Sequence, residues 1–470
     1  MAISAIFGCK YACYKNRESG NKCWNWDLCK YSTNGSYRTE THVEKYVCMS
    51  VHHLNLEFLL PMTIIAILFI ALAISGTWSY FLYYMLKSFR DSPRLQKSLE
   101  PSRRALPRVS VIVPARNEEH YIADCLDRLI TQDYPNFEII LIDDSSEDGT
   151  WQIMQNYAAK YKGQIVSLRA GLKPHGWVGK NWACYKGYLQ CRGDLLLFTD
   201  ADTQHSKPTM RLAEQYLWQQ HADAITVVPR LLCKDLWTKM TLPILSIFLH
   251  TRFSALRVNN PKTKIGYFFG SFYLITRSAY EAVGTHKLVR RELIEDGALG
   301  AELKRQRFLI RMVRGEQYVS AVWARDFSTL WHGLRRLLIP LYKQNRAGTV
   351  LVTVAVILLL LAPFILLSFS LWLSNFHTEF ASPNDAPGNL HLSAAILALT
   401  SASAVVLIFI SAAVQSKLGV FQSTMYALCC PIAVSIICSC FVSSLNDARK
   451  GGSVTWRGRQ YNMTEYTNTP

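Results

Sequence analysis

Two aspartates separated by one residue follow an apolar segment of this 470-residue chain. The stretch LLLFTDADT carries four apolar residues and a threonine into Asp200 and Asp202. Carboxylates are costly to bury alone, so such a pair needs cations or hydrogen-bond donors nearby. Their oxygens can share Mg2+ or Mn2+, hard cations that commonly bridge carboxylates to substrate phosphates. A solvated turn also carries this pattern, but the position at the end of an apolar strand favours a metal site.

Two further acidic pairs stand at the ends of predicted elements. Asp143 and Asp144 close the apolar stretch FEIILIDD, and Glu295 and Asp296 open the stretch EDGALGAELKRQR. Asp143 and Asp144 could simply form a turn and cap the following helix. Glu295 and Asp296 could stabilise the positive end of a helix dipole. Whether these residues have a catalytic or binding role therefore depends on whether the fold brings the three pairs together.

The elements that carry these pairs alternate between strands and helices. Short runs rich in Val and Ile predict strands, and apolar residues at helical spacing predict the helices between them. This alternation implies an α/β fold with a mostly parallel sheet flanked by helices, and such sheets bind ligands at the carboxyl ends of their strands. The strands are expected within Arg108–Ala115, Phe137–Asp144, Ile165–Gly171, Gly193–Asp200 and Ala222–Val228, with a strand and a helix in Gly270–Gly284 and a helix over Glu295–Arg307.

Four uncharged apolar stretches predict membrane helices, one before the α/β region and about three after it. Each reaches the roughly 20 residues that cross a bilayer. They are Phe58–Leu86, Thr349–Leu373, Leu392–Val414 and Leu418–Leu445. The chain is therefore expected to be a multi-pass integral membrane protein, with its membrane domain at 349–445. The apolar segment Asp235–Leu256 is expected to hold the α/β domain against the membrane surface.

The basic residues predict the orientation in the membrane. Lys87, Arg90 and Arg94 follow the first stretch closely, whereas Asn375–His391, after the second, contains no Lys or Arg. Because positive residues stay in the cytoplasm, residues 103–345 should be cytoplasmic and residues 1–57 outside, joined by a span at 58–86. This topology and anionic headgroups account for much of the net charge of +17. No nucleic-acid-binding signature occurs, so nucleic acid is not an expected partner.

The two ends of the chain leave alternatives open. In the tail, 446–470, four basic residues favour the cytoplasm, but three full spans after the domain would place it outside. We favour an internal tail, with one of the last two apolar stretches re-entrant or lying along the surface and Pro431 as a candidate break. The first 48 residues hold five cysteines and the sequon Asn34-Gly-Ser. Disulfides, zinc and glycosylation all remain open there.

Four motifs in order resemble the family-2 glycosyltransferases, inverting enzymes of the GT-A fold. They are VSVIVPARNEE, QDYPNFEIILIDDSSEDGT, GDLLLFTDADT and IEDGALG, and the resemblance covers about residues 107–310. The stretch HGWVGKNWACYKGY, the flanking spans and the tail GGSVTWRGRQY resemble a membrane-bound branch. That branch contains hopene-associated and diaponeurosporenoate glycosyltransferases and, more distantly, ceramide glucosyltransferase.

The resemblance implies a role for each matching residue. Asp202 with Asp200 would hold Mg2+ or Mn2+, and Asp296, with Glu295 beside it, would be the general base. The nucleotide-sugar site would comprise Pro114, Ala115, Glu118, Asp143, Asp144, Lys180 and Asp200. Candidates for contact with the diphosphate or a lipid headgroup are Arg335, Arg336, Trp456, Arg457 and Arg459.

Plainer readings stand beside several of these roles. Lys180 could be a solvated residue on a glycine-bounded loop, and the basic residues of both the TLWHGLRRL stretch and the tail could only anchor to lipid. The histidines, His332 among them, have no metal spacing and are expected to be ordinary hydrogen-bonding residues. A dinucleotide-dependent oxidoreductase is disfavoured, because VIVPARNEE has no glycine-rich turn. A transporter is disfavoured because the four apolar stretches carry no charge.

The sequence thus predicts an inverting hexosyltransferase that moves a sugar from a UDP- or GDP-sugar to a membrane lipid or isoprenoid acceptor at the cytoplasmic face, in glycolipid biosynthesis. Processive relatives carry Gln-x-x-Arg-Trp before the membrane helices, and this chain has TLWHGLRRL there. Transfer of one or a few sugars is therefore favoured over the first alternative, a processive polysaccharide synthase. The second alternative is a non-catalytic membrane binding protein of the same fold. The sugar, the lipid and the oligomeric state are left open.

Overall fold

The computed structural model describes residues 11–16, 20–25, 41–96, 105–380, 388–450 and 453–462. The chain divides into two units, residues 1–64 and 65–470. The first contains the antiparallel hairpin β1 (Tyr11–Asn16) and β2 (Gly20–Asn25), whose register sets Cys13 opposite Cys23. It also contains the first part of α1 (Thr41–Asp91). The sequon at Asn34 and two of the five cysteines lie outside the described residues.

The second unit contains a seven-stranded sheet with the order β11-β8-β10-β6-β3-β4-β5. All pairings are parallel except those of β10, which runs antiparallel to both β6 and β8. The predicted α/β fold with a mostly parallel sheet is confirmed. The strands are β3 (Val109–Ala115), β4 (Phe137–Asp143), β5 (Ile165–Arg169), β6 (Leu195–Phe198), β8 (Ala224–Val228), β10 (Tyr273–Thr276) and β11 (Ile310–Arg314).

Helices cover both faces of this sheet because alternate strand residues point to opposite sides. In β4, Ile139 and Leu141 join the core beneath α2 and α3, whereas Ile140 and Ile142 pack toward α4. The helices around the sheet are α2 (Ile122–Ile130), α3 (Thr150–Lys160), α4 (Gly179–Tyr188), α5 (Thr209–Gln219), α7 (Ala255–Val258), α8 (Arg277–Ala282), α9 (Thr285–Leu288) and α10 (Glu295–Arg305).

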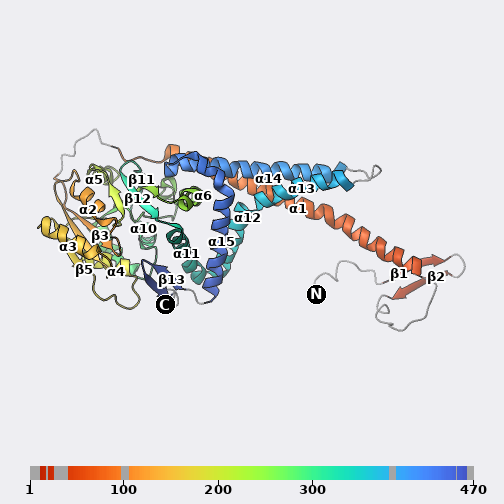
Figure 1. Ribbon diagram of the computed structural model, residues 1–470, viewed down its shortest axis with the longest axis horizontal. Coiled ribbons are helices and arrows are strands. Elements are labelled where there is room, and N and C mark those ends of the chain that lie inside the picture. Colours follow the sequence, from red (N-terminus) through yellow and green to blue (C-terminus); the bar gives the residue numbers. More distant parts are fainter. Residues whose placement is uncertain are drawn as a thin grey trace. The chain divides into compact units, whose positions relative to one another are not determined.

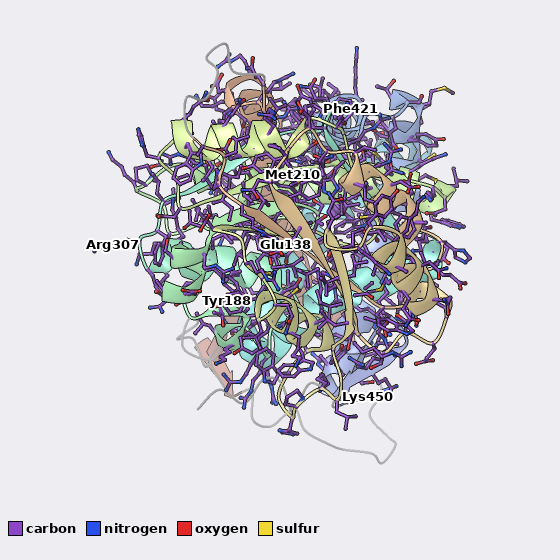
Figure 2. The ribbon with its side chains drawn as sticks, turned by 90° about the vertical axis from the view of Figure 1, so that its left-hand side faces the viewer. Glu138, Tyr188, Met210, Arg307, Phe421 and Lys450 are labelled. Atoms are coloured by element: carbon purple, nitrogen blue, oxygen red, sulfur yellow. The ribbon has the colours of Figure 1, made fainter. Side chains whose placement is uncertain are left out.

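A buried charged side chain lies at the edge of the sheet where the strands begin. Glu138, labelled in Figure 2, is 5% exposed. Its carboxylate accepts hydrogen bonds from Ser110 Oγ at 2.6 Å, from Arg108 Nη2 at 2.7 Å and from the Arg192 amide at 2.7 Å. Those donors offset the desolvation of the charge and hold its pKa below the ordinary value. This acid is structural, because the strands end at the opposite edge of the sheet.

Two local expectations differ from the structure. Residues after Val178 form helix α4, whose first turn carries Lys180, rather than a glycine-bounded loop. A small sheet of order β7-β12-β9 also stands beside the large one, formed by Thr203–His205, Val319–Ala324 and Arg230–Cys233. Its three- to six-residue strands carry no strong apolar alternation, so their pattern gave no strand signal.

The apolar segments form helices beside the α/β domain (Figure 1). Among the described residues, three helices are long and apolar enough to cross a membrane, at Ile65–Asp91, Leu392–Val420 and Thr424–Arg449. The remaining predicted stretch, Thr349–Leu373, falls on two helices, α12 (Arg346–Leu360) and α13 (Ala362–Phe380), which are bent by 46° relative to each other. The break therefore falls at Leu361. Pro431, the expected break, instead lies in the first turn of α15 (Cys430–Arg449), where proline is tolerated.

The remaining helices join the membrane segment to the α/β domain. In Figure 1, α13 and α14 (Gly388–Gln415) lie side by side, and α15 runs across their direction. Helix α15 packs against α6 (Leu236–Arg252) and α11 (Phe327–Gln344). Short turns η2 (Ser416–Val420) and η3 (Thr424–Cys429) connect α14 to α15. After α15, a hairpin of β13 (Ser453–Trp456) and β14 (Arg459–Asn462) ends the described chain.

Candidate active site

A cavity of about 500 Å³ opens where β3, β4 and β6 end. It gathers most of the predicted residues from segments far apart in the sequence. The predicted residues that line it are Pro114, Ala115, Glu118, Asp144, Lys180, Asp200, Asp202, Glu295, Asp296, Arg336 and Arg457. The three acidic pairs therefore contribute to one cavity, as the parallel sheet required.

Lys180 joins the acids on one side of the cavity. Its Nζ lies 2.6 Å from Asp200 Oδ1 and 2.6 Å from Glu295 Oε1. Burial alone would raise the pKa of Asp200, but the ammonium holds it below its ordinary value. The pKa of Lys180 lies well above its ordinary value, because the charges of Asp200 and Glu295 outweigh its burial. The first turn of α4 thus holds two carboxylates around one ammonium instead of offering a solvated lysine.

Asp296 has a different protonation equilibrium from its neighbour. Burial and then the adjacent charge of Glu295 raise its pKa to about 7. A Cβ placed on Gly270 would lie 2.8 Å from Asp296 Oδ2 and 2.9 Å from Asp200 Oδ2. Oxygens of Asp296 and Asp200 therefore approach the same glycine surface. A carboxylate with this pKa in a cavity can accept a proton near neutral pH.

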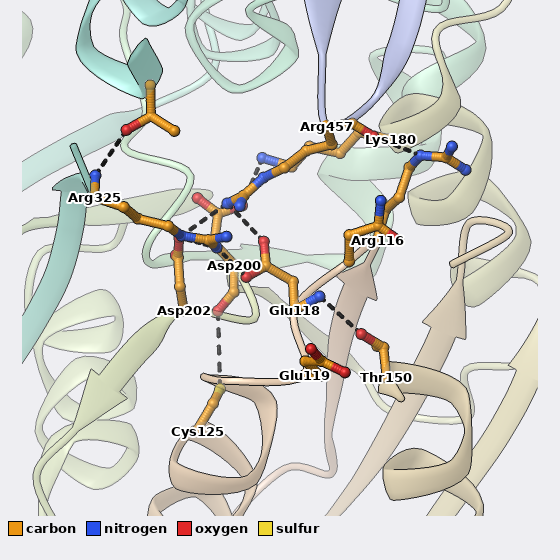
Figure 3. A network of polar contacts seen from close by, with 12 residues as sticks. Arg116, Glu118, Glu119, Cys125, Thr150, Lys180, Asp200, Asp202, Arg325 and Arg457 are labelled. Carbon is orange, nitrogen blue, oxygen red and sulfur yellow. Dashed lines mark hydrogen bonds and ion pairs between the residues drawn. The ribbon is translucent and has the colours of Figure 1, made fainter. Parts of the chain in front are cut away.

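A second group of charges surrounds Asp202 and is drawn in Figure 3. Nη2 of Arg457 lies 2.6 Å from Glu118 Oε1 and 3.1 Å from Asp202 Oδ2. Arg325 contacts Glu118 as well and lies 4.0 Å from Asp202 Oδ2. Burial raises the pKa of Glu118 to about 7 and also raises the pKa of Asp202, despite these two arginines. Two arginines thus face two carboxylates, and burial of the acids rather than a shortage of cations raises their pKa.

Asp144 is held by a third arginine. Nη1 of Arg459 lies 2.9 and 3.0 Å from the two oxygens of Asp144. Burial nevertheless raises the pKa of this carboxyl. Gly179 begins α4 against this pair, and a Cβ there would lie 2.1 Å from both Arg459 Nη1 and Asp144 Oδ2. Only glycine leaves room for the ion pair.

Among the described side chains, three predicted residues do not line the cavity. Asp143 is fully buried, and its Oδ1 accepts a hydrogen bond from the Ser146 amide at 3.1 Å, which matches the turn reading. Arg335 pairs with Asp447 on α15 at 2.7 Å. Arg459 pairs with Asp144 beside the cavity, and Trp456 belongs to β13.

Sequence reasoning missed several cavity residues. Arg116 donates to the carbonyls of Asp144 at 2.7 Å and Arg457 at 2.9 Å. It lies within VIVPARNEE, so the motif was recognised, but the contacts of this long side chain were not predicted. Arg325 follows β12, a strand without a sequence signal. His332 lines the cavity from α11, although its spacing suggested an ordinary histidine.

The carboxylate oxygens of Asp200 and Asp202 fit Mg2+ or Mn2+, which prefer oxygen ligands. Burial raises the pKa of Asp202, and a bound cation would stabilise the ionised form of this carboxylate. The described residues contain no ready group of three His, Cys, Asp or Glu ligands. The nearest cation to Asp202 is the guanidinium of Arg457, which would have to move. The residues therefore fit a cation held by Asp202 with Asp200, completed by ligands from outside the chain.

The fold and the acidic cavity define a glycosyltransferase of the GT-A type. Residues 110–284 match the family model described as Glycosyl transferase family 2. This region of the chain is therefore a glycosyltransferase domain of the family-2 type.

Relatives and solved structures extend the comparison. The 4,4'-diaponeurosporenoate glycosyltransferase of Staphylococcus aureus (strain USA300) is 26% identical over 382 residues, which cover 78% of this chain and 91% of that protein. The mannosyltransferase PcManGT from Pyrobaculum calidifontis, solved with GDP-Man and Mn2+, superposes with a TM-score of 0.47 at 17% identity, over 81% of this chain and 99% of that one. TarS 1–349 from S. aureus, solved with UDP-GlcNAc, gives 0.36 at 16% identity, over 75% and 95%.

Proposed function

We propose that the protein transfers a sugar from a UDP- or GDP-sugar to a membrane lipid by one inverting displacement. The observation that carries the proposal is the approach of Asp296 and Asp200 to the same glycine, with Asp202 in the same cavity. In an inverting transfer, the acceptor oxygen attacks the anomeric carbon as the nucleoside diphosphate leaves from the opposite side. The reaction therefore needs a base and a site for the leaving group within a few ångströms, and these acids supply both.

The residues of the chain divide these tasks. Asp296 accepts the proton of the acceptor hydroxyl as the new bond forms, because its raised pKa matches neutral pH. Asp202 with Asp200 would hold Mg2+ or Mn2+, which neutralises charge on the leaving diphosphate. Lys180 keeps Asp200 ionised and holds Glu295 in place. Asp144, at the end of β4, faces the nucleoside side of the donor.

The acceptor side of the cavity is apolar. Leu231, Leu249, Phe269 and Trp323 line it, and Leu249 belongs to α6. Helix α6 packs against the apolar helices α14 and α15, so this wall continues toward the part of the chain that can enter a membrane. An apolar wall of this kind favours binding of a lipid chain, because burial removes the chain's apolar surface from water. The Staphylococcus aureus relative is named for an isoprenoid acid, which supports an isoprenoid acceptor here.

We further propose that α1, α13 and α14 cross the membrane while α12 and α15 lie along its cytoplasmic surface. The 19-residue α13 is long enough for about 28 Å, close to the bilayer core. Three crossings place the N-terminus outside and the tail with the catalytic domain in the cytoplasm. The tail hairpin contacts Glu118 and Asp202, so it lies on the same side of any membrane as the domain. This arrangement agrees with the distribution of Lys and Arg.

A donor screen tests the proposed function. The purified full chain would be incubated with labelled UDP- and GDP-sugars, Mg2+ or Mn2+, and a total lipid extract. Label should enter the organic phase and disappear in Asp202→Ala and Asp296→Ala. Label in long water-soluble polymer would favour a processive synthase. No transfer from any donor, with the folded protein confirmed, would favour the non-catalytic binding protein.

A further inference from the structure

The C-terminal hairpin brings two arginines to the acids of the donor side. Its turn is formed by Arg457 and Gly458, both with positive φ, at 48° and 77°. Thr455, Arg457, Gly458 and Tyr461 line the cavity. A residue more than 250 positions after Asp202 in the chain thus provides the guanidinium nearest to it. This long-range contact needs an explanation, because a tail that only anchored the chain to lipid would not have to contact Asp202 or Glu118.

The backbone of the turn is fixed separately from the side chain of Arg457. Its carbonyl accepts from Arg116 Nε at 2.9 Å. On β14, Arg459 holds Asp144, and the 2%-exposed Tyr461 accepts from the Gly179 amide at 3.3 Å. The hairpin therefore stays attached if the Arg457 side chain turns away. Only that side chain has to move to change the charge at Asp202.

A cation that binds Oδ2 of Asp202 cannot share that oxygen with the Arg457 guanidinium as the structure has it. The guanidinium stands 3.1 Å from Oδ2 and also bridges to Glu118 at 2.6 Å. A divalent ion would stand about 2.0–2.6 Å from a carboxylate oxygen, so the two positive groups would nearly touch. Their repulsion in a buried site is large. Binding of one therefore disfavours the other.

We propose that Arg457 and the divalent cation exchange at Asp202, so that Arg457 neutralises Glu118 and Asp202 before the donor binds and turns to the donor's diphosphate when the cation arrives. This inference rests on the proposed function. The exchange keeps the positive charge inside the cavity in both states, because a guanidinium pairs with phosphate as well as with carboxylate. It makes the hairpin turn a cation-dependent part of the diphosphate site.

The exchange predicts opposite effects of one substitution on two ligands. In Arg457→Gln, Mn2+ alone should bind about tenfold more tightly, as followed by the electron paramagnetic resonance signal of free Mn2+ with the full chain in detergent. In saturating Mn2+, UDP or GDP should bind about tenfold more weakly in calorimetry, because the arginine that meets the diphosphate is gone. Arg457→Lys, which keeps a point charge without the fork, should lie between wild type and Arg457→Gln for both ligands.

Matched variants and alternatives make the result decisive. Arg305→Gln removes an exposed arginine that pairs with Glu302 on its own helix and should change neither affinity. A thermal unfolding scan confirms that each variant is folded. The exchange is overturned if folded Arg457→Gln binds Mn2+ no more tightly than wild type. It is also overturned if Arg457→Lys binds Mn2+ with the affinity of wild type. If wild type binds nucleotide with Mn2+ and Arg457→Gln binds it equally well, only the exchange fails. If wild type binds neither UDP nor GDP, the proposed function fails too.

Discussion

The ammonium of Lys180 lies 2.6 Å from Oε1 of Glu295, a residue 115 positions later in the sequence, and contacts Asp200 at the same distance. One side chain therefore links the predicted base motif to the predicted metal motif. Removal of one partner from a buried ionic group typically costs about 3–5 kcal/mol, because the remaining charges stay unpaired. The ammonium is thus a positioning group for both motifs.

Lys180→Met should lower kcat/KM at least about 100-fold and lower the Tm, because Asp200 and Glu295 would repel each other. Lys180→Arg should recover part of the rate by keeping the charge. Lys186→Met, on the same helix but outside the cavity, is the control. Steady-state kinetics and thermal unfolding check the prediction. Normal kcat in Lys180→Met would show that the two motifs do not depend on this contact.

The strands that carry the acids could be predicted from the sequence because the rule for a buried strand is local. Runs such as VSVIVPA and FEIILID carry apolar residues on both faces, as parallel strands covered on both sides do. The carboxyl-end rule then placed Asp144 and Asp200 at one edge without knowledge of the strand order. The antiparallel insertion of β10 could not be predicted, because no local pattern encodes strand order.

The missed parts of the site come from long-range packing. Arg325 depends on β12, which pairs with β9 about 90 residues earlier in the chain. The contacts of Arg457 and Arg459 depend on how the tail folds back on the domain, which composition does not encode. The membrane break was assigned to Pro431, but proline is compatible with a first helical turn. The bend at Leu361 is followed by Pro363 in the first turn of α13, a break signal in the sequence that was not used.

The raised pKa of Asp296 predicts a specific pH dependence. The base is the carboxylate, so it is present above a pKa of about 7 and is lost as the pH falls below it. With an alcohol acceptor, kcat/KM should fall about tenfold per pH unit below that point. Asp296→Asn should lose about 100-fold or more above pH 7 and should lack this pH dependence. An acceptor that is already a carboxylate has no proton to lose, and a weak response of Asp296→Asn would identify that class of acceptor.

Asp202 should control the response to metal. Asp202→Asn keeps the shape of the side chain but removes the charge, so Mn2+ binding should fall at least about tenfold and transfer should fall with it. Chelation with EDTA should abolish wild-type transfer, and added Mn2+ should restore it. Asp194→Asn, exposed at the other end of β6, is the matched control. Full activity of the wild type in EDTA would contradict the metal assignment.

The membrane arrangement predicts a glycosylation pattern in a secretory membrane. An engineered sequon within residues 381–387, between α13 and α14, should be modified because that segment would lie outside. A sequon placed after Asn462 should not be modified, because the tail would stay with the catalytic domain. Gel mobility before and after glycosidase treatment reads out both sites. Modification of the tail sequon would mean that α15 crosses the membrane.

Gly270 should be irreplaceable for activity although it carries no functional group. A Cβ there would lie 2.8 Å from Asp296 Oδ2, 2.9 Å from Asp200 Oδ2 and 3.3 Å from Lys180 Nζ, so Gly270→Ala must displace the base or the metal-side acid. Displacement of about 1 Å can cost on the order of 100-fold in rate. We therefore expect kcat to fall by about that factor while the Tm changes little, since the methyl group meets side-chain ends and not backbone. Gly76→Ala, on α1 and outside the cavity, is the control, because a Cβ there meets nothing within 4 Å. If both variants retained full kcat, Asp200 and Asp296 would not need the close approach on which the proposed displacement depends.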